Sequence, residues 1–136
     1  MSSHPDVFLG AAYWIQGDGN HPAFVLSDPS QTGGESLFIR FTSYVPERHE
    51  GREVFTNIDF PDLRHESVVH YYGTRIATAL SIQSGVNDGY FEVLNPLPTD
   101  VLKRIVAEAK ANDDFAPKFM RKLPPDDHPS LADEEE

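Results

Sequence analysis

The segment between residues 17 and 44 constrains the fold more than any other part of the chain. It reads as turn, strand, turn and strand: residues 23–28 are mainly apolar and lie between two prolines, and Gly33-Gly34 then allows the chain to reverse. Residues 36–43 alternate in polarity, which is typical of a strand with one buried face. The pattern predicts a β-hairpin whose second strand presents Leu37, Ile39 and Phe41 on one face and Ser36, Phe38, Arg40 and Thr42 on the other.

The length and composition indicate one globular domain. The chain has 136 residues, of which 39% are hydrophobic and 11% aromatic, enough for a single core. No apolar run approaches the ~20 residues needed to span a bilayer, and the N-terminus lacks the basic and apolar regions of a signal peptide. The absence of cysteine excludes disulfides, thiolate nucleophiles and cysteine-ligated zinc. We therefore expect a cytoplasmic protein without a membrane-spanning segment.

The net charge of −11 argues against long-range attraction to nucleic acid. Residues 126–136 contribute six of the negative charges and no lysine or arginine, so the rest of the chain is only moderately acidic. RNA binding would need a local basic groove, and ordinary acidic solubility is the simpler interpretation. The prolines and acidic residues at the end of the chain predict that residues 124–136 form a disordered tail.

Several short strands are expected besides the hairpin. Residues 11–16, 53–58 and 90–93 each fit a strand. Residues 67–79 are rich in β-branched and aromatic side chains, and they predict one or two strands with a bend at Gly73. We expect this strand to continue toward residue 83 and to end in a turn.

One amphipathic helix is expected after the strands. It would run from Asp100 to Asn112 with Thr99 as its N-cap, and Arg104 and Glu108 would form an i,i+4 ion pair on its surface. Residues 115–123 would add one further turn. The predicted fold is mainly β, an SH3-like barrel or bent antiparallel sheet with a C-terminal α-helix over residues 1–123. The helix would bury Val101, Leu102, Ile105, Val106 and Ala109.

Sequence motifs for metal binding or serine catalysis are missing. His65 and His70 are five residues apart, whereas a helical zinc motif needs a separation of four. On a strand these two side chains would point to opposite faces, so we interpret them as surface or turn histidines. The G-x-S-x-G elbow of serine hydrolases is absent from the sequence. We predict no metal site and no cofactor.

Two stretches of the chain resemble the MazF/PemK-like toxins. Residues 19–29, with the sequence GNHPAFVLSDP, are similar to the family's Gly-x-Arg-Pro turn and apolar strand. Residues 37–43, with the sequence LFIRFTS, are similar to its strand that ends in a Thr-Thr or Thr-Ser pair. The resemblance implies an SH3-like barrel, a homodimer, an antitoxin as partner and metal-independent cleavage of single-stranded RNA. The family's turn arginine falls on His21 here, and its threonine falls on Thr42.

The chemistry of RNA cleavage without a metal can be argued from the residues themselves. The attacking 2′-OH needs a base, the leaving oxygen needs an acid, and the phosphorane needs a cation. His21 suits either proton transfer, Arg40 can grip the phosphate oxygens, and Thr42 can donate a hydrogen bond. These three residues form the predicted catalytic site. The predicted substrate-binding residues, with bases stacked on the tyrosines, are Arg64, His65, Tyr71, Tyr72 and Arg75.

A second function stays open because each of these residues also has a plain structural interpretation. His21 is a turn residue before a proline, Arg40 a solvated side chain, Thr42 a strand former, and the tyrosines fit a barrel core. The alternative is a catalytically silent SH3-like barrel that binds a protein partner, as a regulatory or phage–host interaction module. The acidity and the histidine at position 21 favour this alternative, whereas the hairpin motif and the retained threonine favour the ribonuclease.

Overall fold

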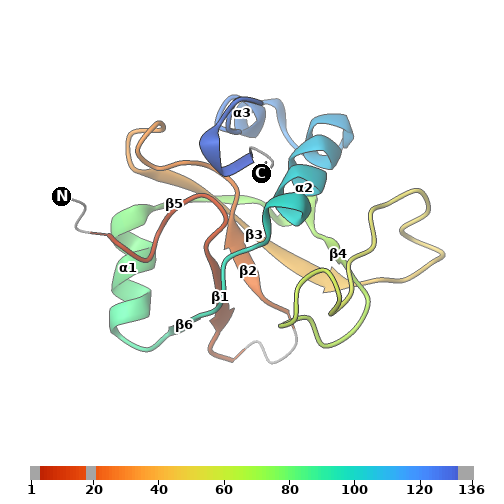
Figure 1. Cartoon of the computed structure of the whole chain (residues 1–136), viewed down its shortest axis with the longest axis horizontal. Coiled ribbons are helices and arrows are strands. Elements are labelled where there is room, and N and C mark those ends of the chain that lie inside the picture. The colour runs from red at the N-terminus through yellow and green to blue at the C-terminus, as the bar shows by residue number, and fades with distance from the viewer. Residues whose placement is uncertain (1–3, 18–20, 132–136) are drawn as a thin grey trace, which may run out of the picture.

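The sheet is built around β3 (Glu35–Ser43), the longest strand of the computed structural model, which describes residues 4–17 and 21–131 (Figure 1). β2 (Ala23–Val25) pairs antiparallel with one edge of β3. β1 (Ala12–Ile15) lies beside β2, and β6 (Phe91–Val93) lies beside β1. These strands form one antiparallel sheet.

The hairpin predicted from the alternating pattern is confirmed. Phe24 on β2 lies opposite Ile39 on β3, and both side chains are fully buried. Gly33 and Gly34 have φ angles of 66° and 88° in the turn before β3. Glycine adopts such positive φ angles without strain, which explains why the chain reverses there.

The other edge of β3 is covered by one stretch of chain that is broken in the middle. β4 (Ser67–Val69) pairs with the end of β3, and β5 (Arg75–Thr78) pairs with its beginning. Between them lies the 3₁₀ helix η1 (Tyr71–Gly73). Of the one or two strands predicted with a bend at Gly73, the structure has two, separated by η1.

A helix follows β5, where the sequence had suggested a continuing strand and then a turn. The helix α1 (Ala79–Asn87) begins after Thr78, whose side chain accepts a hydrogen bond from the Ser81 amide over 3.0 Å. Such a cap satisfies one of the free amides of the first turn. The buried residues of α1, Ala79, Ile82 and Gln83, follow the i, i+3, i+4 spacing of a helix face. The prediction that the strand continues toward residue 83 is therefore wrong, because these residues form a helix.

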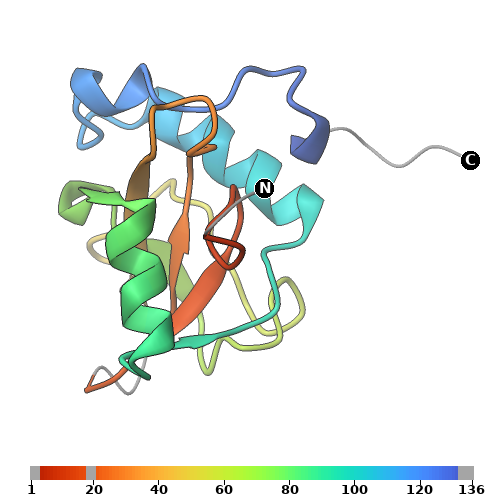
Figure 2. The same ribbon diagram turned by 90° about the vertical axis from the view of Figure 1, so that its left-hand side faces the viewer.

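The two longer helices cover opposite faces of the sheet (Figure 2). α2 (Thr99–Ala111) confirms the predicted C-terminal helix, although Thr99 is its first residue and no side chain caps it. It packs over a core that contains Phe24, Ile39 and Phe41. α1 covers a smaller cluster on the other face. Because β2 and β3 are sandwiched between the two layers, their alternate side chains enter different cores.

The long connection between β3 and β4 is irregular. The strand predicted at residues 53–58 is reduced to one bridge between Phe55 and Ser67. Arg104 on α2 contacts this connection through ion pairs of 2.9 Å with both Glu53 and Asp59. The expected pair between Arg104 and Glu108 is therefore replaced by partners from the connection.

The chain after α2 packs back onto the domain. It contains a short helix, α3 (Pro117–Met120), where one turn was expected, and a 3₁₀ turn, η2 (Pro129–Leu131). Residues 124–131, expected to be disordered, instead bury Leu131 in the α2 core and leave His128 only 7% exposed. Residues 132–136 of the predicted tail lie outside the described residues.

The architecture is a mixed α/β fold with a substantial six-stranded antiparallel sheet. In the described residues, β6 pairs only with β1 at one border of the sheet, so the strands do not close into a barrel. Within the same residues, the structure contains no helix that is both long and apolar enough to cross a membrane.

Candidate functional site

Two histidines and a serine meet where three strands begin or end. His21 comes just before β2, Ser43 ends β3, and His65 comes just before β4. The Ser43 hydroxyl lies 3.0 Å from Nε2 of His21 and 2.8 Å from Nε2 of His65. The two Nε2 atoms are 3.2 Å apart, and the rings meet edge to face. We call His21, Ser43 and His65 the His–Ser cluster.

Backbone hydrogen bonds bring these residues together. The Phe41 amide donates to the Pro22 carbonyl over 3.1 Å, which extends the β2–β3 pairing toward His21. The Tyr44 amide donates to the Glu66 carbonyl over 3.0 Å, and Ser43 pairs with Ser67 in the ladder. His21 and His65 therefore approach Ser43 from the two opposite edges of β3.

The protons available to the His–Ser cluster are too few for three full hydrogen bonds. The serine hydroxyl carries one proton, and a neutral imidazole carries one proton on only one of its two nitrogens. If one Nε2 donates to Ser43 and Ser43 donates to the other Nε2, the short contact between the two nitrogens has no proton of its own. The arrangement therefore suits groups that exchange a proton or share a third ligand.

A hollow lined by two arginines and a histidine lies beside β3. Its volume is about 340 Å³, and Arg40, His70 and Arg75 line it together with Ile15, Phe38, Gly73 and Tyr90. Phe38 and Arg75 are cross-strand partners, and Arg40 is two residues further along β3. We call this space the basic hollow. It brings together Arg40 and Arg75, which were predicted from the sequence for two different roles.

A second hollow adjoins the basic hollow, because Ile15 and Tyr90 line both. It is lined further by Trp14 and Arg64, whose guanidinium carbon lies 4.6 Å from the centre of the indole ring. Such stacking holds the flat guanidinium against the ring. Of the predicted substrate-binding residues, His65 thus lies in the His–Ser cluster, Arg75 in the basic hollow and Arg64 beside it.

Two predicted tyrosines lie elsewhere. Tyr71 is 2% exposed, and its hydroxyl donates to Glu108 over 2.9 Å, so it cannot stack on a base. Burial, followed by the negative charge of Glu108, raises the pKa of Tyr71 above its usual value. Tyr72 is the opposite case, at 80% exposed on η1.

The hydroxyl beside the two histidines belongs to Ser43 and not to the predicted Thr42. Thr42 lies opposite Val68 in the β3–β4 ladder, while the neighbouring Ser43 supplies the hydroxyl between the histidines. Ser43 is still paired with Ser67 in the ladder, so the alternation of β3 places it on the opposite face from Arg40. The sequence feature that points to Ser43 is the Thr-Ser pair at the end of the strand, since either hydroxyl can donate a hydrogen bond.

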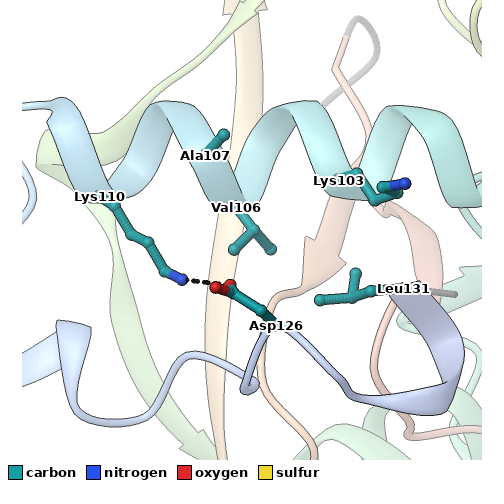
Figure 3. A pocket seen from close by; sticks show the side chains of 6 residues that line it. All are labelled: Lys103, Val106, Ala107, Lys110, Asp126 and Leu131. Carbon is teal, nitrogen blue, oxygen red and sulfur yellow. Dashed lines mark hydrogen bonds and ion pairs between the residues drawn. The ribbon is translucent and has the colours of Figure 1, made fainter.

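A separate hollow of about 430 Å³ lies between α2 and the C-terminal segment (Figure 3). Figure 3 shows Lys110 pointing to Asp126, with which it forms an ion pair of 2.8 Å, while Val106 and Leu131 face each other beside it. These contacts attach the segment to the helix. The lining holds no histidine or hydroxyl group.

No protein-family model, curated protein or solved structure matches this chain. Among the described residues, no group of three or more histidine, cysteine, aspartate or glutamate side chains gathers in the manner of a metal centre. The geometry of the His–Ser cluster and the basic hollow therefore carries the functional argument.

Proposed function

We propose that this chain is a metal-independent endoribonuclease acting on single-stranded RNA. In this proposal it is a divergent relative of the MazF/PemK-like toxins, and its fold is a divergent form of their SH3-like barrel. The observation that carries the proposal is the contact of His21 and His65 with one serine hydroxyl at the end of β3. In this proposal the protein acts in the cytoplasm as a homodimer, and an antitoxin restrains it.

The reaction needs two proton transfers at one phosphate. One neutral imidazole of the His–Ser cluster accepts the proton of the 2′-OH, and the 2′ oxygen forms a bond to phosphorus. The bond from phosphorus to the 5′ oxygen breaks, and the other imidazole, in its protonated form, donates a proton to this leaving oxygen. The products are a 2′,3′-cyclic phosphate and a 5′-hydroxyl end. Histidine suits both steps because its charge changes near neutral pH.

The phosphate must enter between the two rings, which are now in contact. His65 is exposed whereas His21 is half-buried, so in this proposal the ring of His65 turns aside. Catalytic contacts often reach their productive geometry only in the complex with substrate. The hydroxyl of Ser43 then keeps one hydrogen bond to a ring while the other ring faces the opposite side of the phosphate.

The basic hollow supplies the charge that an acidic protein needs for binding RNA. Arg40 and Arg75 offer guanidinium groups for phosphate oxygens. Tyr90 is 52% exposed between the two hollows and offers a ring on which a base can stack. The local grouping of cations meets the requirement for a basic groove, despite the net charge of −11.

A silent binding module remains the second candidate. The exposed Tyr72 favours it, because a tyrosine that is 80% exposed is a suitable anchor for a protein interface. The partner would then be an antitoxin-like or other regulatory protein, and the His–Ser cluster would have no catalytic role.

The deciding experiment incubates the purified full chain with single-stranded RNA in the presence of EDTA. We expect cleavage, and we expect His21→Ala, His65→Ala and Arg40→Ala to reduce its rate by about 10²–10⁴-fold, the usual contribution of an acid, base or charge-stabilising group. His4→Ala is a matched control, because His4 lies beside Asp28 and Gly34 near the other end of β3.

Three results would contradict the proposal in different ways. If EDTA abolishes cleavage, the metal-independent mechanism is wrong. If cleavage survives unchanged in the three variants, the activity stands but its site lies elsewhere. If no RNA is cut, the binding module becomes the better interpretation.

A further inference from the structure

The His–Ser cluster has a feature that proton transfer alone does not explain. Three atoms with lone pairs, the two Nε2 atoms and the Ser43 oxygen, lie 2.8–3.2 Å from one another. A hydrogen bond needs a proton between each pair, and neutral groups cannot supply all three. A cation placed above the plane of the three atoms would use one lone pair from each atom and need no proton between them.

The distances within the triangle fit a transition-metal ion. A metal–nitrogen bond of about 2.0–2.1 Å places two tetrahedral ligands about 3.3–3.4 Å apart and two adjacent octahedral ligands about 2.8–3.0 Å apart. The oxygen–nitrogen distances of 2.8 and 3.0 Å match adjacent octahedral ligands, and the Nε2–Nε2 distance of 3.2 Å falls between the octahedral and tetrahedral values. The cluster thus has the dimensions of one face of a coordination shell.

We propose that His21, His65 and Ser43 bind a divalent transition-metal ion of the zinc, cobalt or nickel class. Neutral imidazoles prefer these ions over magnesium or calcium, which favour carboxylate and carbonyl oxygens. Water completes the coordination shell. Because the three atoms meet at one place, we expect one ion per chain.

A bound ion has a direct consequence for the proposed cleavage. The lone pair that binds the metal is the one that would accept the 2′-OH proton, so a metal-bound imidazole cannot act as a base. We therefore expect the bound ion to inhibit the proposed cleavage. This consequence rests on the proposed function, whereas the binding of the ion does not.

Binding is tested by isothermal titration calorimetry of the full chain with zinc chloride in a buffer that does not chelate metals. We expect one site, and we expect His21→Ala and His65→Ala each to weaken binding by at least about tenfold, the lower range for changes around a metal site. His4→Ala controls for the loss of any histidine, and far-ultraviolet circular dichroism confirms that each variant is folded. No binding of zinc, or equal binding by both cluster variants and the wild type, would overturn the proposal.

A second titration uses cobalt chloride and the visible absorbance of the ion. Binding to the cluster should change the cobalt spectrum of the wild type, and the change should disappear in the double variant His21→Ala/His65→Ala. An unchanged spectrum in the wild type, or the same change in the double variant, would show that the ion is not bound by these imidazoles.

Cleavage assays separate this inference from the proposed function. Zinc at saturating concentration should slow the wild type, and EDTA should restore the rate. If zinc binds but no RNA is cut, the metal site is supported and the proposed ribonuclease function is contradicted. If RNA is cut and zinc neither binds nor inhibits, the proposed ribonuclease function is supported and the metal site is contradicted.

Discussion

The hydroxyl of Tyr71 donates a hydrogen bond of 2.9 Å to one carboxylate oxygen of Glu108, 37 residues further along the chain. The other oxygen of Glu108 accepts from the Arg52 side chain over 3.1 Å and from the Glu53 amide over 2.6 Å. Glu108 therefore joins α2 to η1 and to the irregular connection before β4. Its side chain is only 11% exposed, so these partners replace water.

The first prediction concerns this junction. Glu108→Ala should lower the free energy of unfolding by about 3 kcal/mol, because it leaves the Arg52 guanidinium, which is 18% exposed, without its carboxylate. Urea denaturation followed by circular dichroism measures the change. The control is Glu47→Ala, an exposed glutamate in the same connection, which should change stability by less than about 0.5 kcal/mol. Equal effects of the two changes would contradict the role of Glu108.

The second prediction concerns alkaline pH. Burial is the main cause of the raised pKa of both Tyr13 and Tyr71, and the neighbouring carboxylates of Asp6 and Glu108 add to it. A phenol whose pKa is higher in the folded chain contributes stability that is complete below its ordinary pKa of about 10 and is lost as the pH rises above it. Tyrosinate absorbance from these two residues should therefore appear together with the loss of circular dichroism. Ionisation of Tyr71 in a chain that stays folded would refute the prediction, and Tyr71→Phe identifies its share of the absorbance.

The third prediction tests the face of α2 that contacts the sheet. Ile105 is fully buried in the larger core, so Ile105→Ala should cost about 2–5 kcal/mol. Lys110→Ala, on the same helix but in an exposed ion pair, should cost less than about 0.5 kcal/mol. Arg104→Ala should fall between them, because its guanidinium pairs with Glu53 and Asp59 and lies 4.4 Å from the centre of the Phe55 ring. Thermal or urea denaturation ranks the three, and a different order would contradict the packing.

The fourth prediction concerns the C-terminal segment. Deletion of residues 126–136 should lower the melting temperature by more than about 5 °C, since Leu131 fills part of the α2 core and His128 Nε2 lies 2.8 Å from Asp28. Leu131→Ala alone should cost about 2 kcal/mol. The control is Asp127→Ala, at an exposed residue of the same segment, which should leave the melting temperature almost unchanged. An unchanged melting temperature after the deletion would mean that the segment does not contribute to the fold.

The fifth prediction separates the two neighbouring hydroxyls at the end of β3. Under the proposed ribonuclease function, Ser43→Ala should lower the cleavage rate by about tenfold, a loss of about 1.4 kcal/mol in transition-state stabilisation, because the hydroxyl positions both imidazoles. Ser43→Thr should restore most of the rate, and Thr42→Val should have the smaller effect. Initial rates on one RNA substrate provide the comparison. A larger loss in Thr42→Val would return the role to the residue expected from the family resemblance.

The parts of the fold that the sequence predicts well depend on local periodicity. The hairpin and α2 each carry a complete alternating or helical pattern, and the core position of Ile105 follows from it. The helix α1 was missed because its first residues follow a strand that is rich in β-branched and aromatic side chains. The Thr78 cap and the spacing of Ile82 and Gln83 were visible, but the apolar run before them suggested a longer strand.

The candidate site was predictable only in part, because it depends on contacts between distant segments. His21 and Arg40 followed from the hairpin, whereas the approach of His65 to His21, 44 residues away, depends on the pairing of β4 with β3. Such register between distant strands leaves no periodic trace in the sequence. Tyr71 shows the same limit, since its burial follows from the turn at η1 and from Glu108 on another helix.

The pairing of β1 with β6 has a consequence for how the protein is made. Trp14 on β1 lies opposite Glu92 on β6, which is synthesised 78 residues later. A nascent chain that has already joined β1 to β2 therefore leaves the ribosome with the other edge of β1 unpaired. Such an edge can pair with another chain. The newly made protein is thus most exposed to aggregation before residue 93 emerges, and slow translation upstream of that point would prolong the risk.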